Sequence, residues 1–390
     1  MVAAVYCLPE VMNALIHDEI ETSILDFQKK NGVITLDAEK LRYISSSGIR
    51  ILYKLYKVQH ELRIDNVDDD IFSILYDAGT TEIFTVNKKV QELINDNWEV
   101  SGVGATGTVY KIDRDTAIKV YGEGYGFDFV NQERILARQA FISGVPTVIP
   151  SRNARVGNCY ATIFELINSS SLGEELNDPD RYEQLMDDYV AMIRHLHSLR
   201  DTKGVFTDIQ ELWLKYEYML REGLNPSDAD LVIDLYRNSK HSKNFLHGDI
   251  HPGNVMLSDD EMVLVDMACM STGPDIFDVI TIFRLAVYGD ELGLTKVAEK
   301  SMGIRSEMFG KFWEDFAKRY YEVKDRETID RINEDLRLVT ALDFMLSVNT
   351  LPAENVRNYY RKFGSDIMDE IIRPNEDRIR KIMTEGKIDI

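Results

Sequence analysis

The stretch His247-Gly-Asp249-Ile-His251-Pro-Gly-Asn254 decides the fold, and it lies between two apolar runs. Its Pro-Gly pair predicts a loop, in which Asp249 and Asn254 are five residues apart. A carboxylate in such a loop can accept a proton from a hydroxyl group, and an amide oxygen can coordinate a hard divalent cation. The pattern therefore predicts a catalytic loop with Asp249 as general base and Asn254 as metal ligand.

A second acid follows this loop at the end of an apolar strand. Asp266 stands in Val263-Leu-Val-Asp266-Met, twelve residues after Asn254. A carboxylate in a buried strand costs free energy unless it is paired or bound to a metal. Asn254 and Asp266 would supply two hard oxygen ligands, and together with nucleotide phosphates this set suits Mg²⁺.

A glycine-rich segment precedes the loop by more than a hundred residues. It reads Gly102-Val-Gly104-Ala-Thr-Gly107-Thr-Val109 and lies between two strand patterns. Glycines let the backbone close over an anion, which the free N–H groups can then bind. A hairpin without a ligand explains this segment equally well when it is taken alone. Because a strand follows rather than a helix, a Rossmann turn and a Walker A loop are both disfavoured.

One strand after the glycines comes a lysine, in Ala117-Ile-Lys119-Val120. From there Lys119 can reach the α- and β-phosphates of a nucleotide, and Glu133 in the following helix is its natural partner. The simpler alternatives are a solvent-facing lysine on an edge strand and a glutamate on a solvated helix face.

Composition limits the remaining possibilities. A chain of 390 residues predicts two domains or one bilobal unit. The net charge of −21 repels nucleic acid and anionic membranes, so a phosphate site must be a local pocket. Three scattered cysteines indicate neither a disulfide framework nor a zinc site. No signal peptide and no run of about 18 apolar residues is found, and we expect a cytoplasmic protein without a membrane partner.

Secondary-structure patterns change along the chain. The first 85 or so residues alternate between short strands at 32–36, 62–67 and 83–86 and helices at 47–56 and 68–77. The patterns that follow are strands at 98–100, 109–112 and 116–120, a helix at 131–141 and two strands within 156–167. From about residue 179 the chain is predicted to be helical, apart from a short β-like segment at 247–267.

Taken in order, these motifs resemble the aminoglycoside phosphotransferase-like (choline-kinase-like) branch of the protein-kinase-like fold, over roughly residues 90 to 390. The chain departs from protein kinases at His251, where they carry a lysine, and at Asp266-Met-Ala, which replaces DFG. The resemblance implies ATP and Mg²⁺ as cofactors, with Asp249 as base, Asn254 and Asp266 as metal ligands, and Lys119 paired with Glu133.

The resemblance also implies roles for residues around these. The segment 163–167 would be the hinge whose backbone holds adenine, and the nucleotide site would comprise Gly102, Gly104, Gly107, Val109, Ala117, Lys119, Glu133, Glu165 and Ile167. His247 would brace the loop, and Asp275 and Asp278 would be structural acids. His195 and His197 point to different faces of one helix, and we interpret them as packing or surface residues.

The N-terminal region has a resemblance of its own. The segment from Leu36 to Arg50 is similar to the central motif of STAS domains, the anti-sigma-factor-antagonist fold. The strands ahead of Ile34 are weak, which predicts a truncated domain. The resemblance implies a protein partner and a regulatory phosphorylation site at Ser46. The alternative is that Ser45 to Ser47 cap a helix.

The sequence thus predicts an α/β STAS-like domain at 1–87 and an α+β bilobal kinase-like domain at 88–390, with an N-lobe at 88–168 and a mostly helical C-lobe at 169–390. The favoured function is phosphoryl transfer to a hydroxyl of a small molecule such as an aminoglycoside or amino alcohol. Two alternatives stay open: a protein serine kinase acting on a STAS domain, and a non-catalytic nucleotide-sensing module.

Overall fold

The computed structural model describes residues 4–95, 97–104, 106–167, 170–258, 261–289, 293–349 and 364–390. Contacts divide the chain into two compact units. One comprises residues 1–95 and 153–158, and the other comprises residues 96–152 and 159–390.

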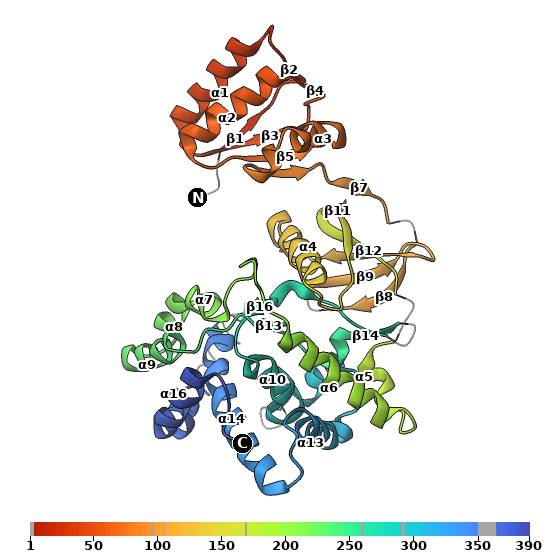
Figure 1. Cartoon of the computed structure of the whole chain (residues 1–390), viewed down its shortest axis with the longest axis vertical. Helices are drawn as coiled ribbons and strands as arrows, with labels where there is room; N and C mark the ends of the chain where they lie inside the picture. The colour runs from red at the N-terminus through yellow and green to blue at the C-terminus, as the bar shows by residue number, and fades with distance from the viewer. Residues whose placement is uncertain are drawn as a thin grey trace. The chain divides into compact units, whose positions relative to one another are not determined.

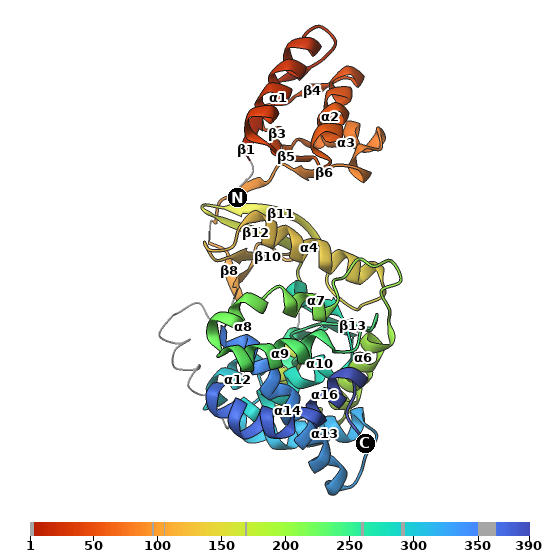
Figure 2. The same ribbon diagram turned by 90° about the vertical axis from the view of Figure 1, so that its left-hand side faces the viewer.

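The first unit is built on a four-stranded parallel sheet in the order β1-β3-β5-β6 (Figures 1 and 2). Its strands are β1 (Ala4–Cys7), β3 (Ile34–Asp37), β5 (Arg63–Val67) and β6 (Thr85–Lys88), and β2 (Val11–Met12) pairs separately with β4 (Tyr43–Ile44). The helices are α1 (His17–Asn31), α2 (Ser46–Gln59) and α3 (Asp69–Asp77). Helices α1 and α2 contact each other.

An apolar stripe on α2 holds this unit together. Ile51, Leu52 and Leu55 recur at helical spacing and are at most 1% exposed, as are Leu36 and Ile64 on the central strands. Each such side chain contributes roughly 1.5–3 kcal/mol on burial. The helices predicted at 47–56 and 68–77 are therefore confirmed, and Asp68 caps the second by accepting a hydrogen bond from the Asp70 N–H.

The structure contains a regular strand ahead of Ile34, where the sequence indicated only weak strands. Strand β1 pairs with β3 from Ala4↔Ile34 to Cys7↔Asp37, and α1 lies between them in the sequence. Helix α1 escapes detection because only Ile20 and Ile24 of its fifteen residues are buried. A largely polar helix has too weak a periodic pattern to be recognised from the sequence.

The serine run is placed at the start of α2. Ser45 occupies the N-cap position, but its side chain accepts no capping hydrogen bond from the backbone of the helix. Its hydroxyl lies 3.3 Å from the Met12 carbonyl oxygen and 2.7 Å from the Ser47 hydroxyl instead. The capping alternative is therefore wrong in its chemistry, although the position is the one expected. Ser46 is the first helical residue and is exposed.

Antiparallel strands form the N-lobe of the larger unit. Strands β8 (Glu99–Val103), β9 (Gly107–Lys111), β10 (Thr116–Tyr121) and β12 (Cys159–Glu165) are neighbours in that order, and α4 spans Phe127–Ile142. The parallel pairing of β7 (Gln91–Leu93) with residues 154–156 of β11 (Pro150–Val156) belongs instead to the first unit. The strands expected near 98–100, 109–112 and 116–120 are confirmed, and so is the helix, although α4 begins four residues before the expected start. Of the two strands expected within 156–167 only β12 lies there, because β11 ends at Val156.

The C-lobe is mostly helical, as expected (Figure 1). Its α-helices are α5 (Leu172–Glu175), α6 (Tyr182–Ser198), α7 (Ile209–Leu214), α8 (Glu217–Gly223), α9 (Pro226–Arg237), α10 (Ile276–Phe283), α12 (Thr295–Met302), α13 (Phe309–Tyr320), α14 (Arg326–Asn349) and α16 (Glu376–Glu385). The β-like segment consists of two short antiparallel pairs, β13 (Phe245–Leu246) with β16 (Ser271–Thr272) and β14 (Val255–Ser258) with β15 (Glu261–Leu264). The expected lobe boundary at 168/169 lies outside the described residues.

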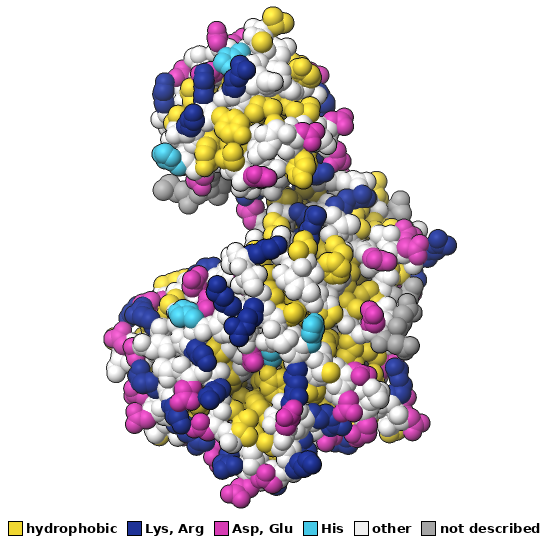
Figure 3. Space-filling view, viewed as in Figure 1, with side chains coloured by type: hydrophobic (Ala, Val, Ile, Leu, Met, Phe, Trp, Pro, Cys, Tyr) yellow, Lys and Arg dark blue, Asp and Glu magenta, His cyan; other side chains and the backbone are white. Residues whose placement is uncertain are grey.

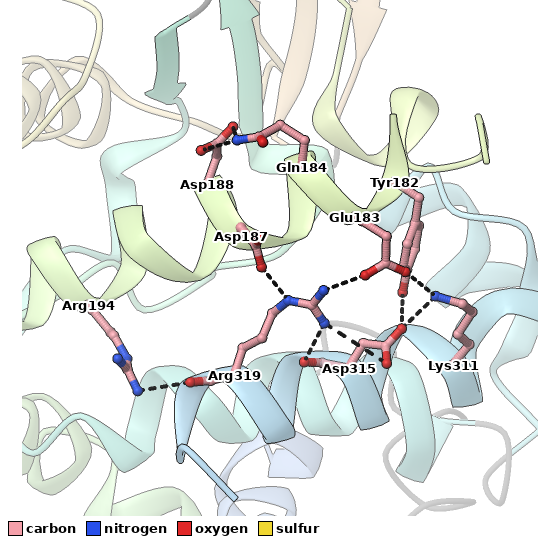
Figure 4. A network of polar contacts seen from close by, with 9 residues as sticks. All are labelled: Tyr182, Glu183, Gln184, Asp187, Asp188, Arg194, Lys311, Asp315 and Arg319. Atoms are coloured by element: carbon pink, nitrogen blue, oxygen red, sulfur yellow. Dashed lines mark hydrogen bonds and ion pairs between the residues drawn. The ribbon is translucent and has the colours of Figure 1, made fainter. Parts of the chain in front are cut away.

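Charged side chains join α6 to α13 (Figure 4). Arg319 contacts Glu183 at 2.6 Å and Asp187 at 2.7 Å, both on α6. Lys311 lies 2.6 Å from Asp315 on its own helix and 3.4 Å from Glu183. The same two helices also meet through aromatic rings, since Tyr189 of α6 lies 6.3 Å from Phe312 and 6.0 Å from Phe316 of α13 between ring centroids. In the part of the chain that the structure describes, no helix is both long and apolar enough to cross a membrane.

Candidate active site

The centre of the site is Lys119 on β10. In the antiparallel ladders Lys119 lies opposite Val109 on β9 and Thr162 on β12. Directly opposed residues share a face of a sheet, and so does Ala117, two positions earlier. The structure therefore brings Val109, Ala117 and Lys119 onto one face of the N-lobe sheet.

Two carboxylates hold the Lys119 ammonium. Its Nζ lies 2.9 Å from Glu133 Oε1 on α4 and 3.1 Å from Asp266 Oδ1. The Lys119 side chain is only 10% exposed. Burial alone lowers the pKa of Lys119, but the Asp266 and Glu133 carboxylates outweigh it and raise the pKa above its usual value. Lys119 is thus a permanently charged group that joins the N-lobe to an acid of the C-lobe.

The glycine segment forms the turn between β8 and β9. Gly104 N–H donates to the Gly107 carbonyl oxygen at 2.9 Å, and Gly102 lies at a register shift between the two strands. A Cβ on Gly107 would lie 2.2 Å from the Val120 carbonyl oxygen, whereas a Cβ on Gly102 meets no described atom within 4 Å. Gly107 is therefore required by strand packing. Ala105 lies outside the described residues.

Asp278 holds the start of the loop that runs from His247 to Asn254. It is fully buried and accepts hydrogen bonds from the backbone N–H groups of His247 and Gly248, both at 2.8 Å. Gly248 has φ +80°, and a Cβ there would lie 2.4 Å from the Cys269 carbonyl oxygen. A side chain at this position would strain the turn. Asp278 and Gly248 thus fix the backbone that leads into Asp249.

Asp249 and Asn254 lie at the two ends of the loop and are joined. The Asn254 side-chain amide donates to the Asp249 carbonyl oxygen at 2.9 Å and to Asp249 Oδ2 at 3.3 Å. His251 Nδ1 accepts from Gly253 N–H at 3.2 Å, and burial lowers the pKa of His251. The Asp249 side chain is 45% exposed, so a substrate can reach its carboxylate.

The loop is also tied to the strand that ends in Asp266. His247 Nε2 donates to the Val265 carbonyl oxygen at 3.0 Å, and Val265 N–H donates to the Asn254 carbonyl oxygen at 3.0 Å. Asp266 has φ +62°, a left-handed conformation that is uncommon for residues other than glycine. His247 thus braces the loop, and these bonds bring Asn254 and Asp266 close together.

The donor atoms of this pair fit Mg²⁺. Asn254 uses its amide nitrogen toward Asp249, which leaves its amide oxygen for a cation, and Asp266 is a carboxylate that is 33% exposed on its side chain. Mg²⁺ is usually bound by one or two protein oxygens together with water and phosphate. A dedicated all-protein cage is not found: among the described residues no group of three or more His, Cys, Asp or Glu could hold a metal ion.

The predicted hinge residues lie at the end of β12. Glu165 pairs with Thr116 and is exposed, and Leu166 N–H donates to the Asp115 carbonyl oxygen at 2.9 Å. Ile167 is half-buried and is the last described residue before the gap at 168–169. Ser46, by contrast, belongs to the N-terminal unit and is not part of this cluster.

Two residues near the centre were missed from the sequence. Lys119 Nζ lies 5.0 Å from the centroid of the Tyr121 ring, a cation–π contact that the alternation Ala117, Lys119, Tyr121 could have revealed. Cys269, three residues after Asp266, packs beside Gly248. No sequence pattern indicates the position of Cys269, because it depends on how two distant loops meet.

Residues 92–301 match the model of the phosphotransferase enzyme family. A comparison with curated protein sequences found no match. Among solved structures, an ADP-bound aminoglycoside phosphotransferase is 14% identical, with a TM-score of 0.46, over 81% of this chain and 99% of that one. A choline/ethanolamine kinase family protein from Mesorhizobium loti is 16% identical, with a TM-score of 0.44, over 75% of this chain and 94% of that one.

An amicoumacin kinase in complex with AMP-PNP and Ca²⁺ is 13% identical, with a TM-score of 0.45, over 77% of this chain and 94% of that one. The family match covers more than half of the 390 residues and contains Lys119, Glu133, Asp249, Asn254 and Asp266. The chain therefore belongs to the phosphotransferase enzyme family and is a phosphotransferase of the kinase type.

Proposed function

We propose that the protein transfers the γ-phosphoryl group of ATP to a hydroxyl group of a small molecule, with Mg²⁺ as cofactor. The observation that carries this proposal is the 3.1 Å contact between Lys119 Nζ and Asp266 Oδ1, which are 147 residues apart. It unites the cation expected to bind phosphates with the acid expected to bind the metal. If this ion pair had only a structural role, there would be no reason for Asn254, which bonds to Asp249, to be tied to the strand that ends in Asp266.

In this proposal the residues of the chain divide the work. Asp249 accepts the hydroxyl proton while the acceptor oxygen bonds to the γ-phosphorus and the bond from that phosphorus to ADP breaks. Lys119 binds the α- and β-phosphates, and Glu133 keeps its ammonium in place. Asn254 and Asp266 hold Mg²⁺, which supplies positive charge against the phosphate oxygens when bound. The turn from Gly102 to Gly107 covers the phosphates.

The adenine ring is assigned to the end of β12. The backbone from Glu165 to Ile167 would bind its edge, and the Ala117 and Val109 side chains would contact its face. Ala117 is 6% exposed and lies on the same sheet face as Lys119, which supports this arrangement.

The acceptor is proposed to be an aminoglycoside or an amino alcohol. The support is the loop itself, which carries a buried His251 at the position where protein kinases carry a lysine. The net charge of the chain does not indicate which acceptor is bound. Acidic and basic side chains are interspersed over the helical lobe on the face shown in Figure 3. We further infer that residues 1–87 are a STAS-like domain that binds a protein partner, which their parallel sheet and helices support.

A second candidate is a protein serine kinase, favoured by one observation. Ser46 is exposed at the first position of α2, where a free helix N-terminus would accommodate an added phosphate. In this form Ser46 would be both the regulatory site of the N-terminal unit and the substrate of a catalytic unit of this kind.

Nucleotide binding is tested by thermal unfolding with ATP alone and with ATP and Mg²⁺. We expect the melting temperature to rise more with both, because a ligand that binds the native state stabilises it by mass action. Asp266→Ala should abolish the Mg²⁺-dependent part. Asp377→Ala, which removes an exposed carboxylate from α16, is the control and should keep it. Equal shifts with and without Mg²⁺ would contradict the proposed metal site.

Transfer is tested with ATP labelled in its γ-phosphate. Panels of aminoglycosides and amino alcohols should become labelled if the first candidate is right. Label that stays on the protein at Ser46 instead would support the serine kinase. Nucleotide binding with label on neither product nor protein would leave only the non-catalytic sensing module.

A further inference from the structure

A chain of polar groups runs behind the catalytic loop, starting at Asp278. Its Oδ1 accepts from Gly248 N–H, and its Oδ2 accepts from His247 N–H, both at 2.8 Å. Oδ2 also lies 3.1 Å from Nε2 of His197, which comes from α6. Asp278 is 0% exposed and His197 is 5% exposed. The backbone turn that leads into Asp249 is therefore connected to a buried histidine on another helix.

The chain continues to Tyr320 at the end of α13. The Tyr320 hydroxyl lies 2.7 Å from His197 Nδ1, so both ring nitrogens have a partner. An ionised carboxylate only accepts hydrogen bonds, so His197 Nε2 must carry a proton to bond to Asp278. In the neutral ring Nδ1 is then an acceptor. Burial of the hydroxyl, and then the nearby Asp275 carboxylate, raise the pKa of Tyr320. The hydroxyl therefore stays protonated and donates a hydrogen bond to His197 Nδ1.

The position of Tyr320 is set by the packing of α13 on α6. Its ring stacks on Phe316 with 5.3 Å between centroids and an interplanar angle of 13°. The Arg194 guanidinium of α6 donates to the carbonyl oxygens of Arg319 and Tyr320 at 2.9 and 2.6 Å. Figure 4 shows Arg194 reaching the end of α13 beside the Arg319 ion pairs. The hydroxyl is thus delivered to His197 by a well-anchored helix end.

We propose that Tyr320 and His197 are positioning residues for catalysis. Tyr320 fixes the ring proton of His197 on Nε2, and His197 in turn holds Asp278 in the orientation that receives the two loop N–H groups. The inference rests on the proposed function, since it concerns the placement of Asp249 as base. Proton transfer depends steeply on the placement of the base, so loosening this chain should lower turnover without weakening nucleotide binding.

The test compares variants of the full chain. Tyr320→Phe removes the donor to Nδ1, and His197→Leu removes the whole link. His197→Gln keeps an N–H group that can reach Asp278. The control is Tyr189→Phe, because the Tyr189 hydroxyl is buried near Asp278 and forms no hydrogen bond with the residues described. It matches Tyr320 in removing one buried hydroxyl from the α6–α13 interface.

The first measurement is turnover of Mg·ATP with water as acceptor. We expect kcat to fall roughly tenfold in Tyr320→Phe and further in His197→Leu, with KM for ATP changed less than about twofold. His197→Gln should recover most of kcat, and Tyr189→Phe should match the wild type. A parallel loss of kcat in Tyr189→Phe, or a kcat of Tyr320→Phe equal to that of the wild type, would overturn the proposal.

The second measurement needs no catalysis. Side-chain ¹⁵N spectra of the histidines, with His197→Gln to assign the signal, should show the Nε2–H form of His197 in the wild type and its change in Tyr320→Phe. Hydrogen exchange at the His247 and Gly248 amides should quicken in Tyr320→Phe and His197→Leu. An Nδ1–H or doubly protonated His197 in the wild type would overturn the inference. Absent transfer to water and to every member of the aminoglycoside and amino-alcohol panels, with this spectroscopic pattern intact, would count against the proposed function alone.

Discussion

At the scale of single residues, Asp249 combines an accessible carboxylate with a fixed backbone. Asp249→Asn keeps the shape of the side chain and removes the proton acceptor. Turnover should therefore fall by roughly two or more orders of magnitude, while ATP affinity changes little. The measurement is steady-state transfer together with ATP titration by calorimetry.

Asn254→Ala is the informative companion, because its amide bonds to Asp249 and its oxygen is assigned to the metal. It should weaken metal binding and turnover together. Near-normal turnover in Asp249→Asn would remove Asp249 from the mechanism.

Cys269 offers a prediction that depends on pH. Although the residue as a whole is exposed, burial of its thiol, and then the nearby carboxylates of Asp249 and Asp266, raise the pKa of Cys269 to about 11. The thiolate is the reactive form, so at pH 8 Cys269 should react with iodoacetamide roughly a hundredfold more slowly than a free cysteine of pKa about 8.5. Raising the pH through 11 should bring the rate up, as followed by peptide mass spectrometry. A fast reaction at pH 8 would show that the carboxylates do not control this thiol.

Individual site residues could be predicted where their type and order along the chain carry the chemistry. Lys119, Glu133 and Asp266 were singled out in this way, and they meet in the structure. The contacts of Tyr320 with His197 could not be predicted, because they join residues 123 positions apart through the packing of two helices. Nothing in the sequence near either residue indicates the other.

At the scale of elements, the β8–β9 hairpin contains two glycines with different surroundings, Gly102 within β8 and Gly107 at the start of β9. Gly107→Ala would press a methyl group against the Val120 carbonyl oxygen, so β9 and β10 must separate. We expect a loss of stability of about 1–3 kcal/mol, measured by urea unfolding. The methyl group of Gly102→Ala would meet no described atom within 4 Å, so this substitution should leave the stability nearly unchanged.

The expected effect of Gly102→Ala on nucleotide binding is a separate matter. If the backbone at Gly102 approaches phosphate, the methyl group should weaken ATP binding without unfolding the lobe. Equal ATP affinity in Gly102→Ala and the wild type would show that this glycine is not part of the phosphate site.

Helices α6 and α13 provide a prediction about stability. Arg319→Ala removes contacts to Glu183 and Asp187, and the Arg319 side chain is 23% exposed. Half-exposed ion pairs contribute up to about 1 kcal/mol each, so we expect a loss of roughly 1 kcal/mol in the free energy of unfolding. Arg326→Ala is the control. The Arg326 side chain also forms ion pairs but is 66% exposed, so its removal should lower the free energy of unfolding by less. Equal losses would mean that burial does not strengthen the Arg319 contacts.

Elements with strong apolar periodicity could be predicted, and those without it could not. The apolar stripe of α2 is visible in the sequence, whereas α1 exposes most of its residues and gives no such pattern. The first turn of α4 could not be predicted from the sequence pattern. Phe129 in that turn packs against Tyr121 and Tyr125, which precede the helix.

At the scale of the whole molecule, the two units have separate cores. The buried hydrophobic residues between Leu8 and Phe84 form one cluster, and those from Leu136 onward form another. We expect a variant lacking residues 1–87 to fold and to transfer phosphate to any acceptor that the full chain accepts, as measured by circular dichroism and labelled ATP. This variant keeps β7, which pairs with β11. A folded but inactive variant would show that the units are catalytically coupled.

The order in which the chain is synthesised gives the Lys119–Asp266 contact a further consequence. Residues 4–93 contain every strand of the parallel sheet, so that unit can fold while the remainder is still being made. Asp266, however, leaves the ribosome 147 residues after Lys119. At about 5–20 residues per second this is a delay of roughly 7 to 30 s. During that interval a nascent chain already contains every strand of the parallel sheet but cannot yet form the Lys119–Asp266 contact, so the N-terminal sheet can form before the site does.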